Sequence, residues 1–142
     1  MKRKASAIWS GDLKKGRGTV STESKILSNT PYSFSTRFEE EPGTNPEELI
    51  GTAHAGCFSM ALSMILGMAG LVPEKIETEA TITMEKQGDG FTITASHLDV
   101  TATIPGADEA AFQKAAEHAK LSCPISKLLN AKITLTARLA PD

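Results

Sequence analysis

The sequence has 142 residues, a length that predicts a single domain spanning residues 1–142 with a substantial core. Hydrophobic residues make up 40% and charged residues 23%, and no repeat or low-complexity tract is present, which is typical of an ordinary soluble globular domain. Fifteen basic residues against 17 acidic ones give a net charge of -2, which argues against nucleic acid or an anionic membrane as a partner.

The first part of the chain is predicted to form a small β-meander. Segments 4–10, 19–24 and 31–38 are rich in β-branched and aromatic residues, and the glycine-punctuated segment 11–18 separates the first two as a turn. Arg37 is therefore expected on a strand.

A long helix is predicted from Pro46 to about residue 69. Asn45 is a good N-cap, proline suits the first helical position, Glu48 completes a capping-box pattern and Gly70 is a stop signal. The helix is apolar around most of its circumference, so it is expected to be central and covered on several sides. Its apolar stretch 58–72 is too short for a membrane span and contains serines and glycines, which favours a core helix.

The second half of the chain combines strands with two helices. Alternation of apolar residues from Glu74 predicts a strand, and segment 91–104 predicts a second one whose phase shift indicates a bulge near Ser96 or His97. An amphipathic helix capped by Asp108, a shorter helix after Cys123 and a last strand at 133–139 follow. Strands and helices come in blocks, so the fold class is α+β with a mainly antiparallel sheet.

The two cysteines are the candidates for chemistry. Cys57 lies in HAGCFSMALSMIL, and Cys123 lies 66 residues later in SCPISKLL. A free cysteine on an apolar helix most often serves packing. Against this, Cys123 precedes Pro124 at a helix start, where the pKa of a thiol is expected to fall, and small residues around Cys57 leave its sulfur accessible.

A thiolate in an apolar site requires a fixed cation to offset its loss of hydration. Arg37 is the candidate and Arg17 is the reserve, while a solvated position for Arg37 is an equally open interpretation.

Other kinds of site have weaker support in the sequence. His54 with Cys57, or His118 near Cys123, has a spacing compatible with zinc, but the tight ligand patterns of zinc sites are missing. His54 is better interpreted as a hydrogen-bonded helix histidine, and His97 and His118 as surface residues. No P-loop, dinucleotide-binding glycine motif or nucleophile elbow is present. The basic N-terminus lacks the apolar core of a signal peptide, and two distant cysteines do not form a secreted disulfide framework, so a cytoplasmic location is expected.

Several motifs in order along nearly the whole chain resemble the OsmC/Ohr family of cysteine-based peroxidases, and within it the osmotically inducible OsmC branch. The motifs are WSGD (9–12), GTVSTES, PYSFSTRFE, GTNPEELIG, HAGCFSMALS and SCPISKLL. The resemblance implies a two-cysteine antioxidant enzyme of the osmotic and oxidative stress response that reduces organic hydroperoxides without a cofactor. It also implies an intertwined homodimer with both active sites at the subunit interface, renewed by a dithiol reductant such as one of the lipoyl type.

The same resemblance assigns roles to individual residues. Cys57 would be the peroxidatic thiol and Cys123 the resolving thiol, with a Cys57–Cys123 disulfide as the oxidised state. Arg37 would hold Cys57 as thiolate and orient the peroxide, and Glu47 would pair with that arginine. The Ohr branch takes its arginine from the early hairpin, where this chain has Arg17, so Arg17 stays an alternative.

An apolar wall is predicted to receive the organic tail of the substrate, with core packing as the alternative role of each member. The wall would consist of Phe58, Met60, Met64, Ile125 and Leu128.

Helix geometry adds a prediction about Glu47. Ten residues separate it from Cys57, about 15 Å along one helix and on a different face. We therefore expect Glu47 to come from the partner chain, or Arg37 to be held across the two-fold interface. Alternatively, Glu47 only complements the positive end of the helix.

Two other function classes stay open from the sequence. One is a redox or stress sensor that uses the same cysteine pair to switch a binding surface. The other is a dimeric binding protein for an apolar ligand, in which the cysteines serve packing.

Overall fold

The long helix α2 (Pro46–Met68) begins and ends where the sequence predicts. The Asn45 side chain accepts a hydrogen bond of 2.8 Å from the backbone N–H of Glu48. At the other end, the N–H of Leu71 bonds the carbonyl of Leu66 at 2.9 Å, and Gly70 takes φ +77°, a left-handed conformation that favours glycine. The predicted caps therefore define this helix.

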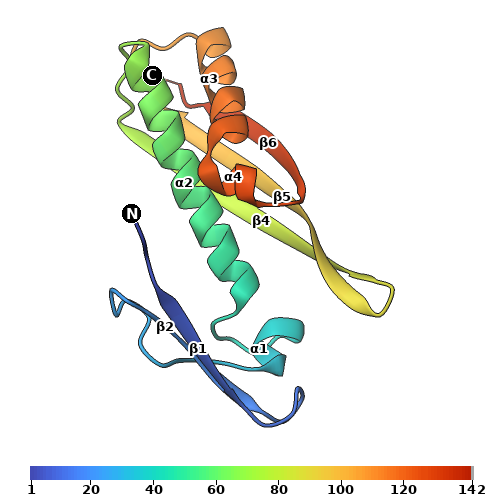
Figure 1. The fold of residues 1–142 in the computed structure, drawn as a ribbon. Helices are drawn as coiled ribbons and strands as arrows, with labels where there is room; N and C mark the ends of the chain where they lie inside the picture. The colour runs from blue at the N-terminus through green and yellow to red at the C-terminus, as the bar shows by residue number, and fades with distance from the viewer. Residues whose placement is uncertain (142) are drawn as a thin grey trace. The chain divides into compact units, whose positions relative to one another are not determined.

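The structure, a computed structural model, describes residues 1–141 (Figure 1). The chain divides into an N-terminal unit, Met1–Leu49, and a C-terminal unit that starts at Ile50. The division falls inside α2, so one helix contributes to both units. A single domain over residues 1–142 stays a prediction.

The N-terminal unit contains the predicted meander. Strands β1 (Ala5–Ser10), β2 (Arg17–Thr22) and β3 (Thr30–Tyr32) form an antiparallel sheet in that order. The strand predicted over 31–38 is wrong beyond Tyr32, because helix α1 (Phe34–Phe38) follows.

A capping box at Ser33 explains this helix. The Ser33 hydroxyl accepts from the Thr36 N–H at 3.3 Å, and the Thr36 hydroxyl accepts from the Ser33 N–H at 2.9 Å. These two bonds outweigh the strand preference of the aromatic residues and threonine. Arg37 consequently lies on a helix and not on a strand.

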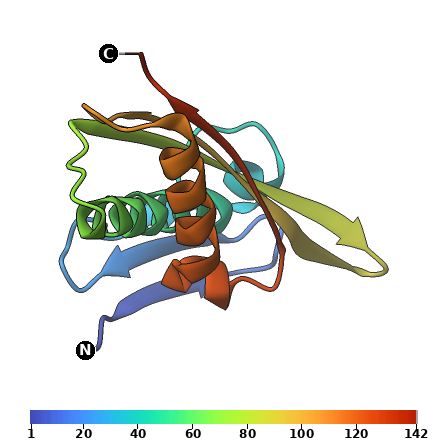
Figure 2. The ribbon, with the colours of Figure 1, turned by 90° about the horizontal axis from the view of Figure 1, so that it is seen from above.

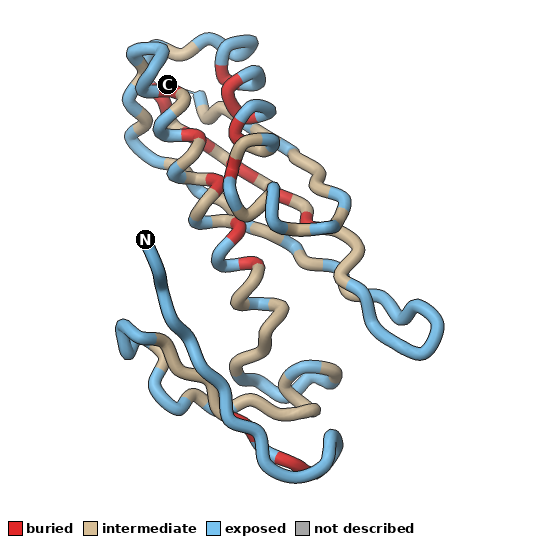
Figure 3. Tube along the Cα trace, viewed as in Figure 1, coloured by how far each residue is buried: buried red, intermediate tan, exposed pale blue. Residues whose placement is uncertain are grey.

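The N-terminal unit buries very little. Among its residues only Gly16 and Gly18 are buried (Figure 3). A Cβ on Gly18 would lie 2.5 Å from the Tyr32 ring and 2.6 Å from the Trp9 ring, so these aromatic rings require glycine there. Large apolar side chains of this unit are exposed, namely Ile8, Leu13 and Ile26. The unit therefore has no hydrophobic core of its own.

The C-terminal unit contains one mixed sheet with helices on one face (Figures 1 and 2). Strands β4 (Lys75–Gln87) and β5 (Gly90–Thr103) form a long antiparallel hairpin, and β6 (Lys132–Leu139) runs parallel to β5. Helices α3 (Glu109–Ser122) and α4 (Pro124–Leu128) make the crossover between β5 and β6. The class is α+β and mainly antiparallel, as predicted, with this one parallel pairing.

The predicted bulge exists but lies earlier in β5. Thr83 pairs with Ala95 and Met84 pairs with Ile93, so Thr94 is the extra residue. The bulge was expected near Ser96 or His97 because the apolar positions change phase between Ala95 and Leu98. In the structure, Ser96 is fully buried on the core side of β5, in line with Leu98 and Val100. Because Ser96 is polar, the apolar pattern does not show that the core-facing positions already begin there, just after the bulge.

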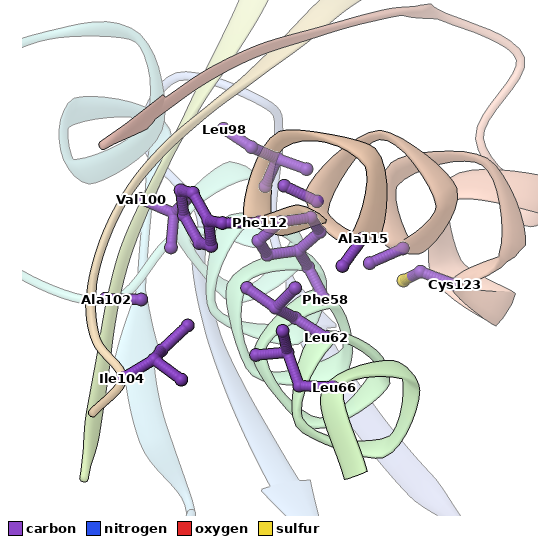
Figure 4. Packing of buried hydrophobic residues seen from close by; sticks show 12 residues of the cluster. Phe58, Leu62, Leu66, Leu98, Val100, Ala102, Ile104, Phe112, Ala115 and Cys123 are labelled. Carbon is purple, nitrogen blue, oxygen red and sulfur yellow. The ribbon is translucent and has the colours of Figure 1, made fainter. Parts of the chain in front are cut away.

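The core lies between α2, α3 and one face of the sheet (Figure 4). Phe58, Leu62 and Leu66 of α2 belong to it. By length and composition α2 is apolar enough to span a membrane, but these three residues make it a core helix, as predicted. On the opposite side of α2, Met60, Met64 and Met68 are 78%, 61% and 71% exposed. The remaining core residues come from β5, the segment that follows it, α3 and the α3–α4 junction: Leu98, Val100, Ala102, Ile104, Phe112, Ala115, Ala116, Ala119 and Cys123.

Candidate active site

The two cysteines come together in the C-terminal unit. Cys57 lies in the middle of α2 and is half-buried, whereas Cys123 is fully buried at the junction of α3 and α4. Their nearest approach is 3.0 Å, and both are free thiols. The crossover through α3 and α4 therefore brings together two cysteines that are 66 positions apart in the sequence.

Competing effects act on the Cys57 thiol. Burial raises its pKa above the ordinary value, and a hydrogen bond and charge interaction with Cys123 raise it further. The backbone N–H of Ile125, in the first turn of α4, bonds the Cys57 sulfur and lowers the pKa. The helix start was expected to act on Cys123; in the structure its N–H group acts on Cys57.

His54 is a buried polar residue one helical turn before Cys57. Its Nδ1 lies 2.6 Å from the Ser96 hydroxyl of β5, and its Nε2 lies 2.8 Å from the Ser126 hydroxyl of α4. Burial lowers the pKa of its imidazole below 6.5, which favours the neutral ring. The prediction of a hydrogen-bonded helix histidine is confirmed.

The other histidines lie where the sequence predicts. His97 is on the sheet face opposite Ser96, with Nδ1 2.6 Å from the Thr134 hydroxyl, and His118 is exposed on α3. Within residues 1–141, no three His, Cys, Asp or Glu residues gather closely enough to hold a metal ion.

Arg37 and Glu47 form an ion pair within the N-terminal unit. Arg37 Nε lies 2.9 Å from Glu47 Oε1, and the two side chains are 37% and 14% exposed. The guanidinium also lies 5.0 Å from the centre of the Phe38 ring, within the range of a cation–π contact. Helix α1 thus places Arg37 beside the Glu47 of its own chain. That this Glu47 serves the Cys57 of a partner chain stays a prediction. The second oxygen, Glu47 Oε2, is buried and has no hydrogen-bond partner among the described residues.

An aromatic cavity of about 200 Å³ lies beside Arg37 within the same unit. Sequence reasoning missed it, although four aromatic residues fall between positions 9 and 38. The reserve arginine, Arg17, lines a different cavity of about 510 Å³. The lining of the aromatic cavity consists of Trp9, Leu13, Tyr32, Ser33, Phe34, Arg37 and Phe38.

The predicted apolar wall divides into two groups. Phe58 has no exposed surface and belongs to the core, and Ile125 is half-buried against it. Met60, Met64 and Leu128 are exposed, the last to 74%. Phe58 therefore packs in the core, whereas the exposed side chains of Met60, Met64 and Leu128 are available to a ligand or to another chain.

Fold and site together define an α+β thiol protein whose two free cysteines are in contact. The family model for "OsmC-like protein" matches residues 38–138, and the chain belongs to this family. It is 52% identical over 137 residues to "Peroxiredoxin OsmC" of Escherichia coli K12, covering 96% of each chain. It is 28% identical over 99 residues to "Organic hydroperoxide resistance protein" of Xanthomonas axonopodis pv. citri, covering 69% of this chain and 68% of that protein.

The fold is also found among solved structures. An OsmC-like protein from Vibrio cholerae matches with a TM-score of 0.76 at 15% identity, covering 96% of this chain and 99% of that one. At this identity the likeness concerns the fold.

Proposed function

We propose that this protein is a thiol-dependent peroxidase that reduces organic hydroperoxides to alcohols. The observation that carries the proposal is the 3.0 Å approach of Cys57 and Cys123, one half-buried and one fully buried. The names of the relatives, peroxiredoxin and organic hydroperoxide resistance protein, support the same reaction class.

The reaction follows from sulfur chemistry. The Cys57 thiolate attacks the peroxide, the O–O bond breaks, and the products are a Cys57 sulfenic acid and an alkoxide that takes up a proton to become the alcohol. The Cys123 thiol then condenses with the sulfenic acid, which forms the Cys57–Cys123 disulfide and releases water. A dithiol reductant, such as one of the lipoyl type, returns both thiols by exchange and leaves as its own disulfide. No cofactor enters these steps.

Arg37 is the proposed activating cation. The raised pKa of Cys57 means that this thiol needs a positive neighbour to ionise near neutral pH. Glu47 engages the Nε of Arg37, which leaves the two terminal amino groups as donors for a thiolate and a peroxide oxygen. Glu47 is thus assigned to hold the guanidinium in place.

The surroundings of Arg37 support an apolar substrate. The aromatic cavity of about 200 Å³ exceeds the roughly 150 Å³ apolar cavity that is known to hold benzene. It supports binding of an alkyl or aryl tail beside the guanidinium, in addition to the predicted wall of Met60, Met64, Ile125 and Leu128. Hydrogen peroxide has no tail to bury and would be the poorer substrate.

A homodimer is the proposed working form. The N-terminal unit buries only two glycines, and the methionines of α2 are exposed, so apolar surface of one chain is left without cover. Glu47 Oε2 is a buried acceptor for which residues 1–141 supply no donor. In the proposed dimer, a second copy covers this apolar surface and supplies a donor to Glu47 Oε2. It also brings the Arg37–Glu47 pair to the cysteines of its partner. The proposed location is the cytoplasm, where both thiols are kept reduced between turnovers.

The proposal is tested by a peroxidase assay with cumene hydroperoxide, hydrogen peroxide and a dithiol. Wild type is expected to turn over and to prefer cumene hydroperoxide, and Cys57→Ser is expected to be inactive. Cys123→Ser is expected to react once and to recover turnover only with a strong small-thiol reductant. A single reaction per wild-type chain with excess dithiol would indicate a sensor, and ligand binding without any peroxide consumption would indicate a binding protein.

A further inference from the structure

A buried chain of hydrogen bonds runs across the C-terminal unit beside the cysteines. It links Ser96 of β5, His54 of α2 and Ser126 of α4, at 2.6 Å and 2.8 Å. Ser96 and His54 have no exposed surface. Neutral imidazole has one donor and one acceptor nitrogen, and a hydroxyl can match either, so both ring nitrogens of His54 have a partner.

Helix α4 is anchored by few buried side chains. None of its five residues is fully buried, and Ile125 is half-buried against the core. His54 and Cys57 are three residues apart on α2 and share a face of the helix. Ile125 and Ser126 are consecutive in α4. Two neighbouring bonds therefore join the helices, Ile125 N–H to the Cys57 sulfur and Ser126 hydroxyl to His54 Nε2.

We propose that Ser96, His54 and Ser126 form a positioning chain that fixes α4 on α2, keeping the Ile125 N–H on the Cys57 sulfur and Cys123 within reach of it. The inference rests on the proposed peroxidase function for its purpose, whereas the alkylation measurement described below does not need that function. His54 and Ser126 act through Ile125 and Cys123 and do not exchange protons with the substrate.

Loss of the Ser96–His54–Ser126 hydrogen bonds has two consequences. When α4 moves away, the Cys57 thiolate loses a hydrogen bond, and a charged acceptor suffers more from that loss than a neutral thiol does. Cys123 is then also farther from the sulfenic acid, so a second peroxide can oxidise Cys57 to sulfinic acid before the disulfide forms.

The test compares matched variants in the reduced protein. His54→Asn keeps a polar group near Ser96 but is too short to reach Ser126, and Ser126→Ala removes the hydroxyl at a half-buried position. His97→Asn is the control for the histidine, since His97 neighbours Ser96 in β5 and bonds threonine on the opposite face. Ser122→Ala is the control for the serine, since the Ser122 hydroxyl donates to the His118 carbonyl within its own helix.

Two quantities are measured: the pH midpoint of Cys57 alkylation by iodoacetamide, and the sulfinic fraction at Cys57 after a fixed excess of cumene hydroperoxide. His54→Asn and Ser126→Ala are expected to shift the midpoint upward, with about fivefold less thiolate at a fixed pH below it, the effect of one net hydrogen bond. Both variants are also expected to accumulate more sulfinic acid at Cys57 than wild type. Ser126→Thr keeps a hydroxyl and should retain the wild-type midpoint and sulfinic fraction, and the two control variants should do the same.

A lower free energy of unfolding with wild-type midpoint and sulfinic fraction in both variants would show a merely structural role and overturn the proposal. Because alkylation needs no peroxide, a wild type that fails to turn over would count against the proposed function while leaving the midpoint test intact.

Discussion

Oxidation to the Cys57–Cys123 disulfide should stabilise the protein strongly. The bond would close a loop across 66 residues, and the loss of unfolded-chain entropy for a loop of that length corresponds to about 4 kcal/mol. Since the cysteines already approach to 3.0 Å, closure needs little movement and little of this gain is lost to strain. For a chain of this size the gain corresponds to a rise of about 12 °C in Tm.

The assay is thermal and urea unfolding of the reduced protein and of protein oxidised with one equivalent of hydroperoxide, with the disulfide verified by mass spectrometry. Cys123→Ser treated in the same way is the control and should show no rise in stability. Oxidised protein that is no more stable than reduced protein would refute the reasoning, because it would mean that α4 must be displaced for the bond to form.

Three further results are expected. Arg37→Lys keeps the charge but loses the planar donor group and should lower kcat/KM for cumene hydroperoxide about tenfold, whereas Arg17→Lys should have little effect; the reverse order would place the activating cation on the early hairpin. Burial lowers the pKa of His54 in the folded state, so the unfolded state takes up the proton first and the free energy of unfolding should decline as pH falls below 6.5. In urea titrations at a series of pH values, the dependence of the free energy of unfolding on pH should be weaker in His54→Asn than in wild type; an equal dependence in both proteins would contradict the prediction. Leu62→Ala removes a fully buried side chain and should lower the free energy of unfolding by about 3 kcal/mol, against less than about 0.5 kcal/mol for exposed Ile26→Ala.

Local signals in the sequence predicted the local structure well. Asn45, Pro46 and Gly70 define the ends of α2, and the period of two defines β4, because caps and alternation act over a few residues. Helix α1 was missed because Ser33 and Thr36 form a capping box without the usual glutamate or glutamine, in a segment with strand-forming composition.

Long-range features could not be derived from the pattern. The parallel pairing of β5 with β6 and the contact of Cys57 with Cys123 depend on how the crossover returns to the sheet. The cysteine pair was predicted from family resemblance and not from spacing. The two hydroxyl partners of His54 were unpredictable for the same reason, since they lie 42 and 72 residues away along the chain.

The missing core of the N-terminal unit has a consequence for local stability. Its sheet is held by backbone hydrogen bonds and exposed aromatic contacts, whereas β5 has Leu98, Val100 and Ala102 fully buried. Segments with few buried contacts open at lower free energy than core strands. Amide hydrogens of β1 and β2 should therefore exchange with deuterium well before those of β5, and a protease should cut first within residues 1–49. The segment that carries Arg37 would thus be the first to open, while the cysteine pair stays enclosed in the better-packed unit.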